Sequence, residues 1–409
     1  MTATSEAPVT LRDWDLVREA LRRKELRQAL YDDGAAVMAD CLLTLHGEAH
    51  RSRRRLENRL FRREVFTHWE REVLGATAEA ALAPYVAAGR GDLVPIGYRT
   101  TMNLTALIAG IDRPARTPEE TEHLYGIVRT FSEGATAVHS TRHPGELDAE
   151  VRRAMETFDE EFFTPSVERR RRLLDREARG DDVEVPADVL TTLLRNSDEL
   201  DLPPEVVRRE IAFYLQAGSH STANAFTHTV DELFRYARSH PEAIDRATDD
   251  LWFAQRCVHE SLRLNPASPV AWRRPLAGVT LSDGTSLAEG ALVVLDLAAA
   301  NRSADHFGAS PGTFDPWRRP APGVPAWGHS FGGGVHACVG TELDGGLECP
   351  DTGPGPDHLF GTVAIMVSTL LAHGGRPDPD QPPTSDRTTS RTHFSAYPVV
   401  FGPRTGAGA

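Results

Sequence analysis

The chain has 409 residues, of which 40% are apolar, 25% charged and 7% aromatic. This composition is typical of a globular protein and excludes the disordered, collagen-like and membrane-spanning classes. Its 45 basic and 59 acidic residues give a formal net charge of −14, whereas nucleic-acid-binding proteins normally carry a basic excess or a basic face. The Arg clusters at 51–55 and 169–172 are typical of solvated helix faces paired with acidic residues. We therefore expect no nucleic-acid partner.

Targeting signals and metal-binding spacings are not readable in the sequence. The first ten residues have neither the basic nor the apolar segment of a signal peptide. The longest apolar run, residues 363–372, is half the length that crosses a bilayer. The four cysteines lack the C-x-x-C spacing of zinc or iron–sulfur sites. These features predict a soluble, cytoplasmic protein without membrane association.

The first two-thirds of the chain is predicted to be mostly helical. Apolar residues recur every three to four positions among charged residues in segments 11–30, 54–86 and 146–179. A fourth segment, 204–239, is nearly uncharged from Leu215 to Ala225, which is typical of a helix buried in the middle of a large domain.

After Pro241 the pattern changes to shorter elements and irregular chain. A loop rich in Gly and Pro, residues 301–340, is long enough to be functional. The predicted elements are a helix at 243–264, strands at 279–281, 286–287 and 291–297 with a turn at 283–284, a last helix at 358–371 and a strand at 398–401. We expect a mainly α fold with a small β portion, in a single domain spanning 1–409.

The strongest chemical signal is the segment FGGGVHACVG, residues 331–340. Its consecutive glycines allow the backbone to pass close to a flat or bulky group. Cys338 follows at the predicted start of a helix, where the dipole and free N–H groups favour a thiolate. An isolated thiolate suits a metal whose other ligands come from a macrocycle, as in haem iron. A phosphate-binding loop is disfavoured because no G-K-S/T follows, and a purely structural cysteine leaves the glycines unexplained.

This segment resembles the haem-binding loop of the cytochrome P-450 superfamily, F-G-x-G-x-H-x-C-x-G, at every fixed position. The resemblance implies the cytochrome P-450 fold, with haem b buried between the long central helix and the Cys-bearing loop. It also implies that Cys338 is the axial thiolate ligand of the iron. The haem-binding positions in the loop are expected to be Phe331, Gly332, Gly334, His336, Cys338 and Gly340.

A second resemblance is the E-x-x-R helix motif, here Glu260 and Arg263. Spaced three residues apart, the two side chains share one helix face and can form an ion pair that supports the loop beneath the haem. The family's third partner comes from P-x-R-F, but Thr313 stands at the Arg position here. Arg318 is a nearby candidate for that contact.

The haem propionates need cations or hydrogen-bond donors. By resemblance these are His50 and Arg54, which match H-x-x-x-R, together with Arg273 and His336. The neighbouring Arg51 and Arg53 are expected to be plain surface charges.

The central helix resembles the A-G-x-D/E-T motif that handles oxygen and protons. Ala217 and Gly218 match, His220 stands at the acid, Ser221 stands at the threonine, and Thr222 follows. A hydroxyl is retained in Ser221, and histidine can carry a proton near neutral pH. The alternative is that His220 faces away from the haem and is hydrogen-bonded in the core. Substrate-facing residues by resemblance are Gln216, Val270, Ala271, Trp272, Thr392, His393 and Phe394.

Two regions depart from the family pattern. A loop at about 344–357 looks inserted on the thiolate side, where family members receive electrons. Its acidic residues, Asp344, Glu348, Asp351 and Asp357, would repel an acidic electron donor. His50 also arrives early in the chain, so an N-terminal helix and two strands are expected to be missing.

The resemblance implies a haem-thiolate monooxygenase that uses O2 to hydroxylate or otherwise oxidise a small organic molecule. A tailoring step in bacterial specialised metabolism is expected, with a ferredoxin and its reductase, or a similar donor, supplying electrons. The alternatives are oxidative coupling or ring formation, peroxide-dependent turnover, and a non-catalytic haem-binding sensor.

Overall fold

The computed structural model describes residues 7–115, 117–350 and 352–403. These residues form two compact units. Unit 1 draws on the described residues within 1–30, 225–377 and 400–409, and unit 2 on those within 31–224 and 378–399. The single domain expected from the sequence stays a prediction.

Helices make up 56% and strands about 9% of the structure, which confirms the predicted mainly α fold with a small β portion. Among the described residues, no helix is both long and apolar enough to cross a membrane.

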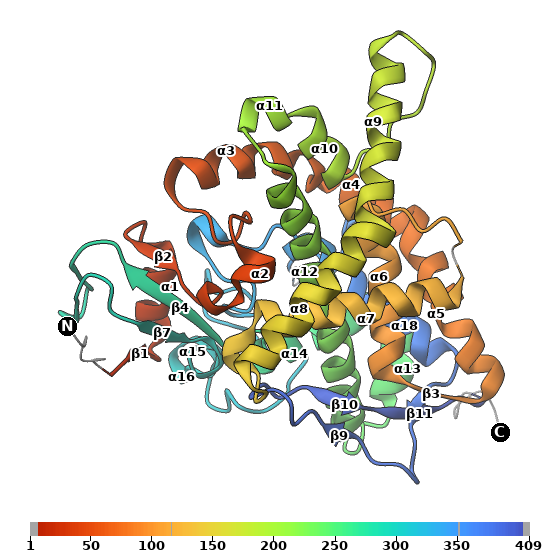
Figure 1. Cartoon of the computed structure of the whole chain (residues 1–409). Helices are drawn as coiled ribbons and strands as arrows, with labels where there is room; N and C mark the ends of the chain where they lie inside the picture. Colours follow the sequence, from red (N-terminus) through yellow and green to blue (C-terminus); the bar gives the residue numbers. More distant parts are fainter. Residues whose placement is uncertain (1–6, 116, 351, 404–409) are drawn as a thin grey trace. The chain divides into compact units, whose positions relative to one another are not determined.

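Unit 1 contains a four-stranded sheet in the order β1-β7-β4-β2, beside which α1 packs (Figure 1). The β1–β7 pair is parallel, and the β4–β7 and β2–β4 pairs are antiparallel. The elements of this unit are β1 (Val9–Leu11), α1 (Trp14–Arg22), β2 (Leu26–Gln28), α13 (Glu242–Asp249), α14 (Leu251–Leu264), β4 (Val270–Pro275), β5 (Val279–Thr280), β6 (Ser286–Leu287), β7 (Val293–Asp296), α15 (Leu297–Ala300), α16 (Ala304–Phe307), η6 (Gly334–His336), α17 (Thr341–Asp344), α18 (Thr362–Ala372) and β8 (Arg376–Pro377).

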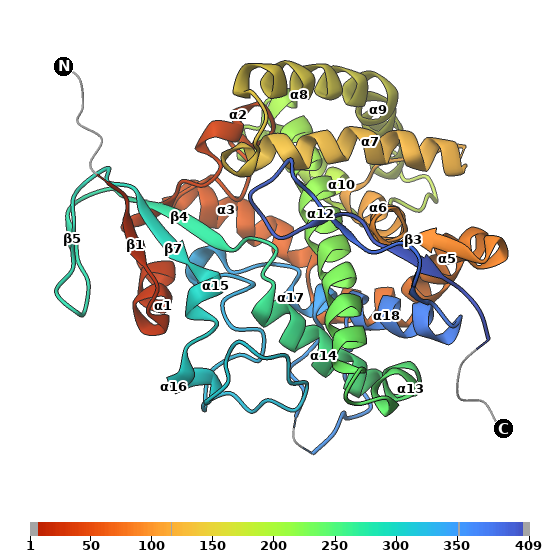
Figure 2. The same ribbon diagram turned by 90° about the horizontal axis from the view of Figure 1, so that it is seen from below.

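Unit 2 is built almost entirely from helices, and its α7 and α8 pack side by side (Figure 2). Its core lies among α2, α6, α7, α8, α10 and the first half of α12. The elements of this unit are η1 (Asp32–Gly34), α2 (Ala35–Met38), α3 (Gly47–Glu57), η2 (Asn58–Leu60), α4 (Arg63–His68), η3 (Trp69–Leu74), α5 (Gly75–Ala88), β3 (Arg90–Asp92), α6 (Leu93–Ala109), α7 (Pro118–Ala135), η4 (Ala137–His139), α8 (Pro144–Phe158), η5 (Asp159–Phe163), α9 (Thr164–Ala178), α10 (Val189–Arg195), α11 (Ser197–Leu200), β9 (Thr384–Ser385), β10 (Phe394–Ala396) and most of β11 (Pro398–Val400).

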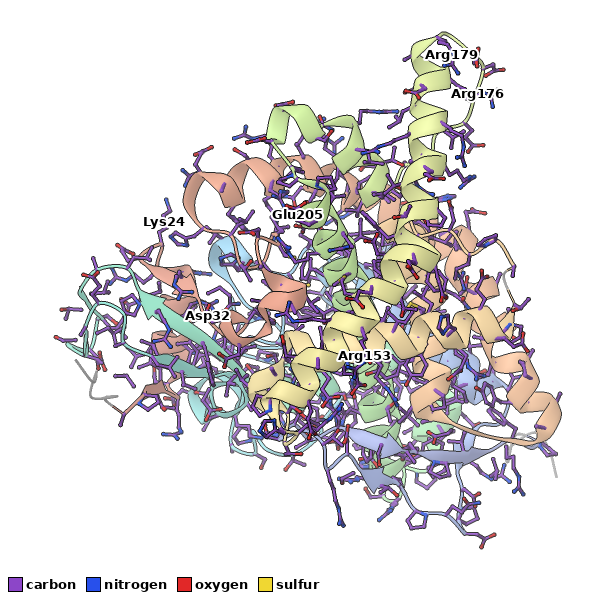
Figure 3. The ribbon with its side chains drawn as sticks, viewed as in Figure 1. Lys24, Asp32, Arg153, Arg176, Arg179 and Glu205 are labelled. Atoms are coloured by element: carbon purple, nitrogen blue, oxygen red, sulfur yellow. The ribbon has the colours of Figure 1, made fainter. Side chains whose placement is uncertain are left out.

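The segment 204–239, with its nearly uncharged middle, forms a single long helix, as predicted. It is α12 (Pro204–Tyr236), whose residues up to Asn224 belong to unit 2 and whose remainder belongs to unit 1. The segment 146–179 is also nearly continuous helix, from α8 through the π-helical turn η5 into α9. At the end of α9, Arg176 and Arg179 extend into solvent (Figure 3).

Other predicted helices are interrupted. Segment 11–30 turns from α1 into strand β2, and segment 54–86 is divided among α3, η2, α4, η3 and α5. Segment 243–264 is two helices, because the carboxylate of Asp250 accepts the amides of Trp252 and Phe253 and thereby caps a new helix. The last helix, α18, begins at Thr362 rather than at position 358.

A helix and two strands, α1, β1 and β2, precede His50. The sequence resemblance led us to expect this region to lack such elements. The turn expected at 283–284 is present, where Gly284 has φ +89° and its amide donates to the carbonyl of Leu281.

Two arginines expected on solvated helix faces are instead buried in ion pairs. Arg53 is 7% exposed, and its Nη1 lies 2.6 Å from Oε2 of Glu210, which is fully buried. Glu210 also accepts the amide of Leu42. Arg170 is paired with Asp112 and Asp188 in the same unit.

Because Glu210 has no exposure to water, its charge depends on Arg53. Replacing Arg53→Ala is expected to lower the free energy of unfolding by about 3 kcal/mol, as for other broken buried ion pairs. Arg51→Ala, in the same helix but with an exposed side chain that pairs with Glu48, is the matched control and should change it by less than about 0.5 kcal/mol. Urea titration of both variants measures the difference, and equal effects would contradict the buried pair.

Candidate active site

The segment 331–340, called the Cys loop below, turns back on itself in unit 1. The amide of Cys338 donates to the carbonyl oxygen of Phe331 at 2.9 Å. Gly332 and Gly334 have φ angles of +67° and +64°, in the left-handed region that favours glycine. Two of the three consecutive glycines are therefore required by the fold of the loop itself.

Gly334 also allows a close approach between the Cys loop and α1. A Cβ atom at this position would lie 2.3 Å from the carbonyl oxygen of Leu21. Gly333, by contrast, is extended, and a Cβ there would make an ordinary contact, 3.4 Å from Cβ of Leu21.

Cys338 differs from the other three cysteines in its exposure. Cys41 and Cys257 are buried, and Cys349 is half-buried, with its Sγ donating to Oε1 of Gln255 at 3.1 Å. Burial raises the pKa of each of these thiols, to about 12 for Cys349, so all three are protonated at pH 7. Cys338 is exposed.

The donor set fits a haem better than a metal held by protein ligands alone. No cluster of three or more His, Cys, Asp or Glu suited to a metal ion occurs in the part of the chain that the structure describes. A single accessible sulfur in a glycine-rich loop instead matches a macrocycle that supplies the other ligands. The expected helix begins at Thr341, three residues after Cys338, and α17 is only one turn long.

Glu260 and Arg263 form the buried ion pair expected from their spacing. Nε and Nη2 of Arg263 each lie 2.7 Å from a carboxylate oxygen of Glu260. Nε of Arg318 lies 2.9 Å from Oε1 of the same carboxylate, so Arg318 makes the third contact where Thr313 has replaced the family arginine. The cluster therefore keeps its three-membered form with an arginine from a different position.

The cluster is connected to the start of the Cys loop through Asn301. Arg263 Nη1 donates to the carbonyl of Asn301, and Asn301 Nδ2 donates to Oγ of Ser330. Oδ1 of Asn301 accepts the amide of His329 at 2.7 Å. The residues immediately before Phe331 are thus fixed to α14.

The residues expected to contact propionates are divided between the units. Arg273 and His336 belong to unit 1, where Arg273 donates to Oε1 of Gln28 at 2.6 Å. His50 and Arg54 lie on one face of α3 in unit 2. Burial, then the charge of Arg54, lowers the pKa of His50 to about 4, so His50 is a neutral N–H donor rather than a cation at pH 7. The propionate contacts stay predictions.

The middle of α12 has an open face. Gly218 is exposed and Ala217 and Ser221 are half-buried, although Gln216 and Thr222 on the same helix are buried. A Cβ atom on Gly218 would point to α6, where it would lie 2.9 Å from Cγ2 of Thr105.

Oγ of Ser221 donates to the carbonyl of Ala217 at 2.7 Å, which leaves its oxygen lone pairs as acceptors.

His220 has hydrogen-bonding partners on both ring nitrogens within unit 2. Nε2 lies 3.3 Å from Nη1 of Arg391, and Nδ1 lies 2.5 Å from Oη of Tyr98. Because an arginine can only donate, Nε2 is the acceptor, and the neutral ring then carries its proton on Nδ1. The ring of His393 packs edge-on against His220 at 5.1 Å.

Burial, and then the charge of Arg391, lowers the pKa of His220 to about 3. At pH 7 this side chain is therefore neutral, and few molecules carry an imidazolium that could donate a proton. The role of His220 in carrying protons stays a prediction, and its environment disfavours the charged form that such a role passes through. The alternative, a histidine hydrogen-bonded in the interior, agrees with this geometry.

The substrate-facing candidates are similarly divided. In unit 1, Val270, Ala271 and Trp272 are half-buried on β4. In unit 2, Thr392 is exposed and His393 is buried. Gln216 lies beside Met38, and Phe394 begins β10.

The sequence analysis did not identify Tyr98 and Arg391 as the hydrogen-bonding partners of His220. Neither belongs to a local motif, and the one available signal was that Arg391 immediately precedes the predicted run Thr392 to Phe394.

Replacing Gly334→Ala is expected to destabilise the protein by at least about 2 kcal/mol. The cause is a left-handed φ, which costs a non-glycine residue about 1–2 kcal/mol, together with the clash at Leu21. Gly333→Ala is the control and should change stability by less than about 1 kcal/mol. Thermal unfolding measures the melting temperatures of both variants. An equal fall in the two would contradict the close approach between Gly334 and Leu21.

Replacing His220→Gln is expected to flatten the dependence of stability on pH. The unfolded imidazole takes up a proton near pH 6.5, whereas the folded one stays neutral down to about pH 3. The stability contributed by this residue is thus complete above pH 6.5 and is lost as pH falls toward 3. Within this window the free energy of unfolding of the variant should change less steeply with pH, by up to about 1.4 kcal/mol per pH unit. Urea titrations across this range, with exposed His123→Gln as the unaffected control, measure the change.

Comparison with known proteins places the chain in one family. A family model described as cytochrome P450 matches residues 5–343. The cytochrome P450 monooxygenase PikC of Streptomyces venezuelae is 34% identical over 175 residues, covering 42% of this chain and 38% of the relative. The methyl-branched lipid omega-hydroxylase of Mycobacterium tuberculosis is 40% identical over 141 residues, covering 33% of this chain and 30% of the relative. The matched segments span less than two-fifths of either relative.

Solved structures superpose on nearly the whole chain. CalO2 superposes with a TM-score of 0.74 at 20% identity, covering 96% of this chain and 90% of the other. Epothilone B-bound cytochrome P450epoK gives 0.72 at 16% identity, covering 96% and 91%. At these identities the likeness shows the fold, which confirms the expected cytochrome P450 fold. With the family model matching well over half of its residues, the chain belongs to the cytochrome P450 family.

Proposed function

We propose that the chain is a haem-thiolate monooxygenase in which Cys338 would supply the thiolate that binds the iron of haem b. The observation that carries this proposal is the exposed sulfur of Cys338 in a loop whose glycine conformations and hydrogen bonds are fixed by α1 and α14. The monooxygenase and hydroxylase activities named for two relatives support the reaction class.

The bound haem thiolate supplies dioxygen activation, because electron donation by the sulfur favours cleavage of the O–O bond. In unit 1 the Cys loop holds the sulfur at a fixed position, and Arg273 provides a cation for a propionate. In unit 2 Arg54 provides another cation, and His50 provides an N–H donor. Oγ of Ser221 is the hydroxyl that accepts and passes on a proton, since His220 is neutral and engaged.

The substrate is a small organic molecule, and the step is a tailoring reaction of bacterial specialised metabolism. The P450 monooxygenase PikC and the solved P450epoK with bound epothilone B support this assignment. We assign electron supply to a ferredoxin and its reductase. In the inserted loop Glu348 and Asp357 are exposed, so the donor must tolerate negative charge there. Asp351 lies outside the described residues.

The absorption spectrum of the reduced protein exposed to CO tests the proposal. A strongly red-shifted Soret band is expected, because the thiolate donates electron density to the iron. Cys338→Ala should lose this band, whereas Cys349→Ala, which removes only the contact with Gln255, should retain it.

A Soret band at the ordinary wavelength, or one that survives Cys338→Ala, would overturn the assignment. Once a substrate is found, the product mass separates the remaining alternatives. Oxygen insertion adds one oxygen atom, oxidative coupling removes two hydrogen atoms, and a sensor consumes no reductant.

A further inference from the structure

Unit 2 contains a cavity with a volume of about 560 Å³. Its walls come from η1 and α2, from the end of α7 with η4, and from the first turns of α8, which pack together within this unit (Figure 2). Ala36, Leu147 and Val151 form apolar parts of the wall. Pockets for small organic ligands have volumes of about 300–1,000 Å³, so this cavity can enclose such a molecule.

Close packing of the surrounding elements fixes the walls of the cavity. A Cβ atom on Gly34 would lie 2.8 Å from the carbonyl oxygen of Ala135, at the end of α7. A Cβ atom on Gly134 would lie 2.4 Å from Cγ2 of Val151, on α8. Both distances are shorter than non-bonded atoms allow, so the two glycines let η1, α7 and α8 approach one another at the cavity.

The loop between η4 and α8 is fixed by an arginine that lines the cavity. Nη1 of Arg142 lies 3.1 Å from Oε2 of Glu133 on α7, and its Nη2 pairs with Glu150 on α8. Oγ of Ser140 donates to Oε1 of Glu133 at 2.8 Å and accepts the amide of Arg142. The cavity is therefore preformed, which lowers the entropic cost of binding a ligand.

The charges around the cavity favour a cationic ligand. The guanidinium of Arg142 already has two carboxylate partners, and the lining carboxylate of Asp148 is paired with Arg152 at 2.8 Å. The other lining carboxylate, Asp33, is exposed. Within the described ranges of the chain, its side chain has no hydrogen bond or ion pair. Asp33 is thus available to a ligand, and the group as a whole carries an excess of negative charge.

The two long helices that meet at the cavity do not offer an anion site. The amide of Gly145, at the start of α8, donates to Nδ1 of His143 at 3.2 Å. The next two amides, of Glu146 and Leu147, donate to the carbonyl oxygen of His143. These N–H groups are therefore occupied. The end of α7 that lies at the cavity is its C-terminus, where the helix dipole favours positive charge.

We infer that this cavity binds a small organic cation with an apolar body. N–H groups of the cation donate to the carboxylate of Asp33, and the body contacts Ala36, Leu147 and Val151. A planar cation with two parallel N–H groups, such as an amidinium, matches the two oxygens of a carboxylate. The inference is independent of the proposed function, because none of the lining residues is assigned to haem, proton transfer or substrate.

The test uses benzamidine, a cation at pH 7, and benzamide, a neutral molecule of nearly the same shape. Each is titrated calorimetrically into the haem-loaded full chain. Saturable binding is expected for benzamidine, and benzamide should bind about fivefold more weakly, as for the loss of an ion pair with an exposed carboxylate. Asp33→Asn should lower the affinity for benzamidine by about the same factor and leave that for benzamide unchanged.

Glu146→Gln is the matched control, because this exposed carboxylate lies in the first turn of α8 but does not line the cavity. It should bind benzamidine as the unaltered chain does. Ala137→Phe places a ring at the cavity wall and should weaken the binding of both probes. If that variant does not fold, the comparison of the two probes on the unaltered chain and on Asp33→Asn still decides.

Equal affinity for the two probes, no saturable binding of benzamidine, or unchanged binding by Asp33→Asn would overturn the inference. The Soret band is recorded during each titration and should stay unchanged, whereas a shift on saturation would place the probe at the iron and not in this cavity. The CO spectrum is measured separately, so a failure of the cation site and a failure of the haem-thiolate assignment give different results.

Discussion

The buried carboxylate of Glu260 is the interaction on which the Cys loop depends. It accepts hydrogen bonds from Arg263 and Arg318, and Arg263 also donates to the carbonyl oxygens of Asn301 and Pro311. Removing the carboxylate would leave two largely buried guanidinium groups without their counter-charge, which costs several kcal/mol. Through this one carboxylate, α14 and the long irregular segment that precedes the Cys loop are fixed to each other. A loop with so little secondary structure can thereby present its cysteine at a constant position.

Features that depend on neighbours in sequence could be predicted, and those that depend on tertiary contacts could not. The uncharged middle of α12, the Cys loop and the Glu260–Arg263 spacing are all local patterns. Arg53 has the same sequence context as an exposed arginine, and only the position of Glu210 on another helix makes it a buried one. The third contact of Arg318 likewise depends on how the chain returns to α14.

The inserted segment after α17 is not a loose addition to the Cys loop. Nε2 of Gln255, on α14, lies within 3.0 Å of the carbonyl oxygens of Gly345, Leu347 and Leu359, and its Oε1 accepts from Cys349 and also contacts His358. One glutamine thus holds both ends of the segment. The sequence marks this region as irregular, but nothing in it indicates that a buried amide on α14 would bind it. The segment is consequently anchored to α14 at both ends.

In α12, the residue at position 220 determines which interactions its neighbours can form. An acid at position 220 would form a strong ion pair with a buried arginine, and that pair would neutralise the arginine's charge. Histidine at this position accepts a hydrogen bond from Arg391 while staying neutral, so it orients the guanidinium without forming an ion pair with it. The same neutrality makes His220 a poor proton donor and leaves the hydroxyl of Ser221 as the group on the open face that can exchange a proton. At the position where the family motif has an acid, this chain therefore has a neutral histidine that orients a guanidinium.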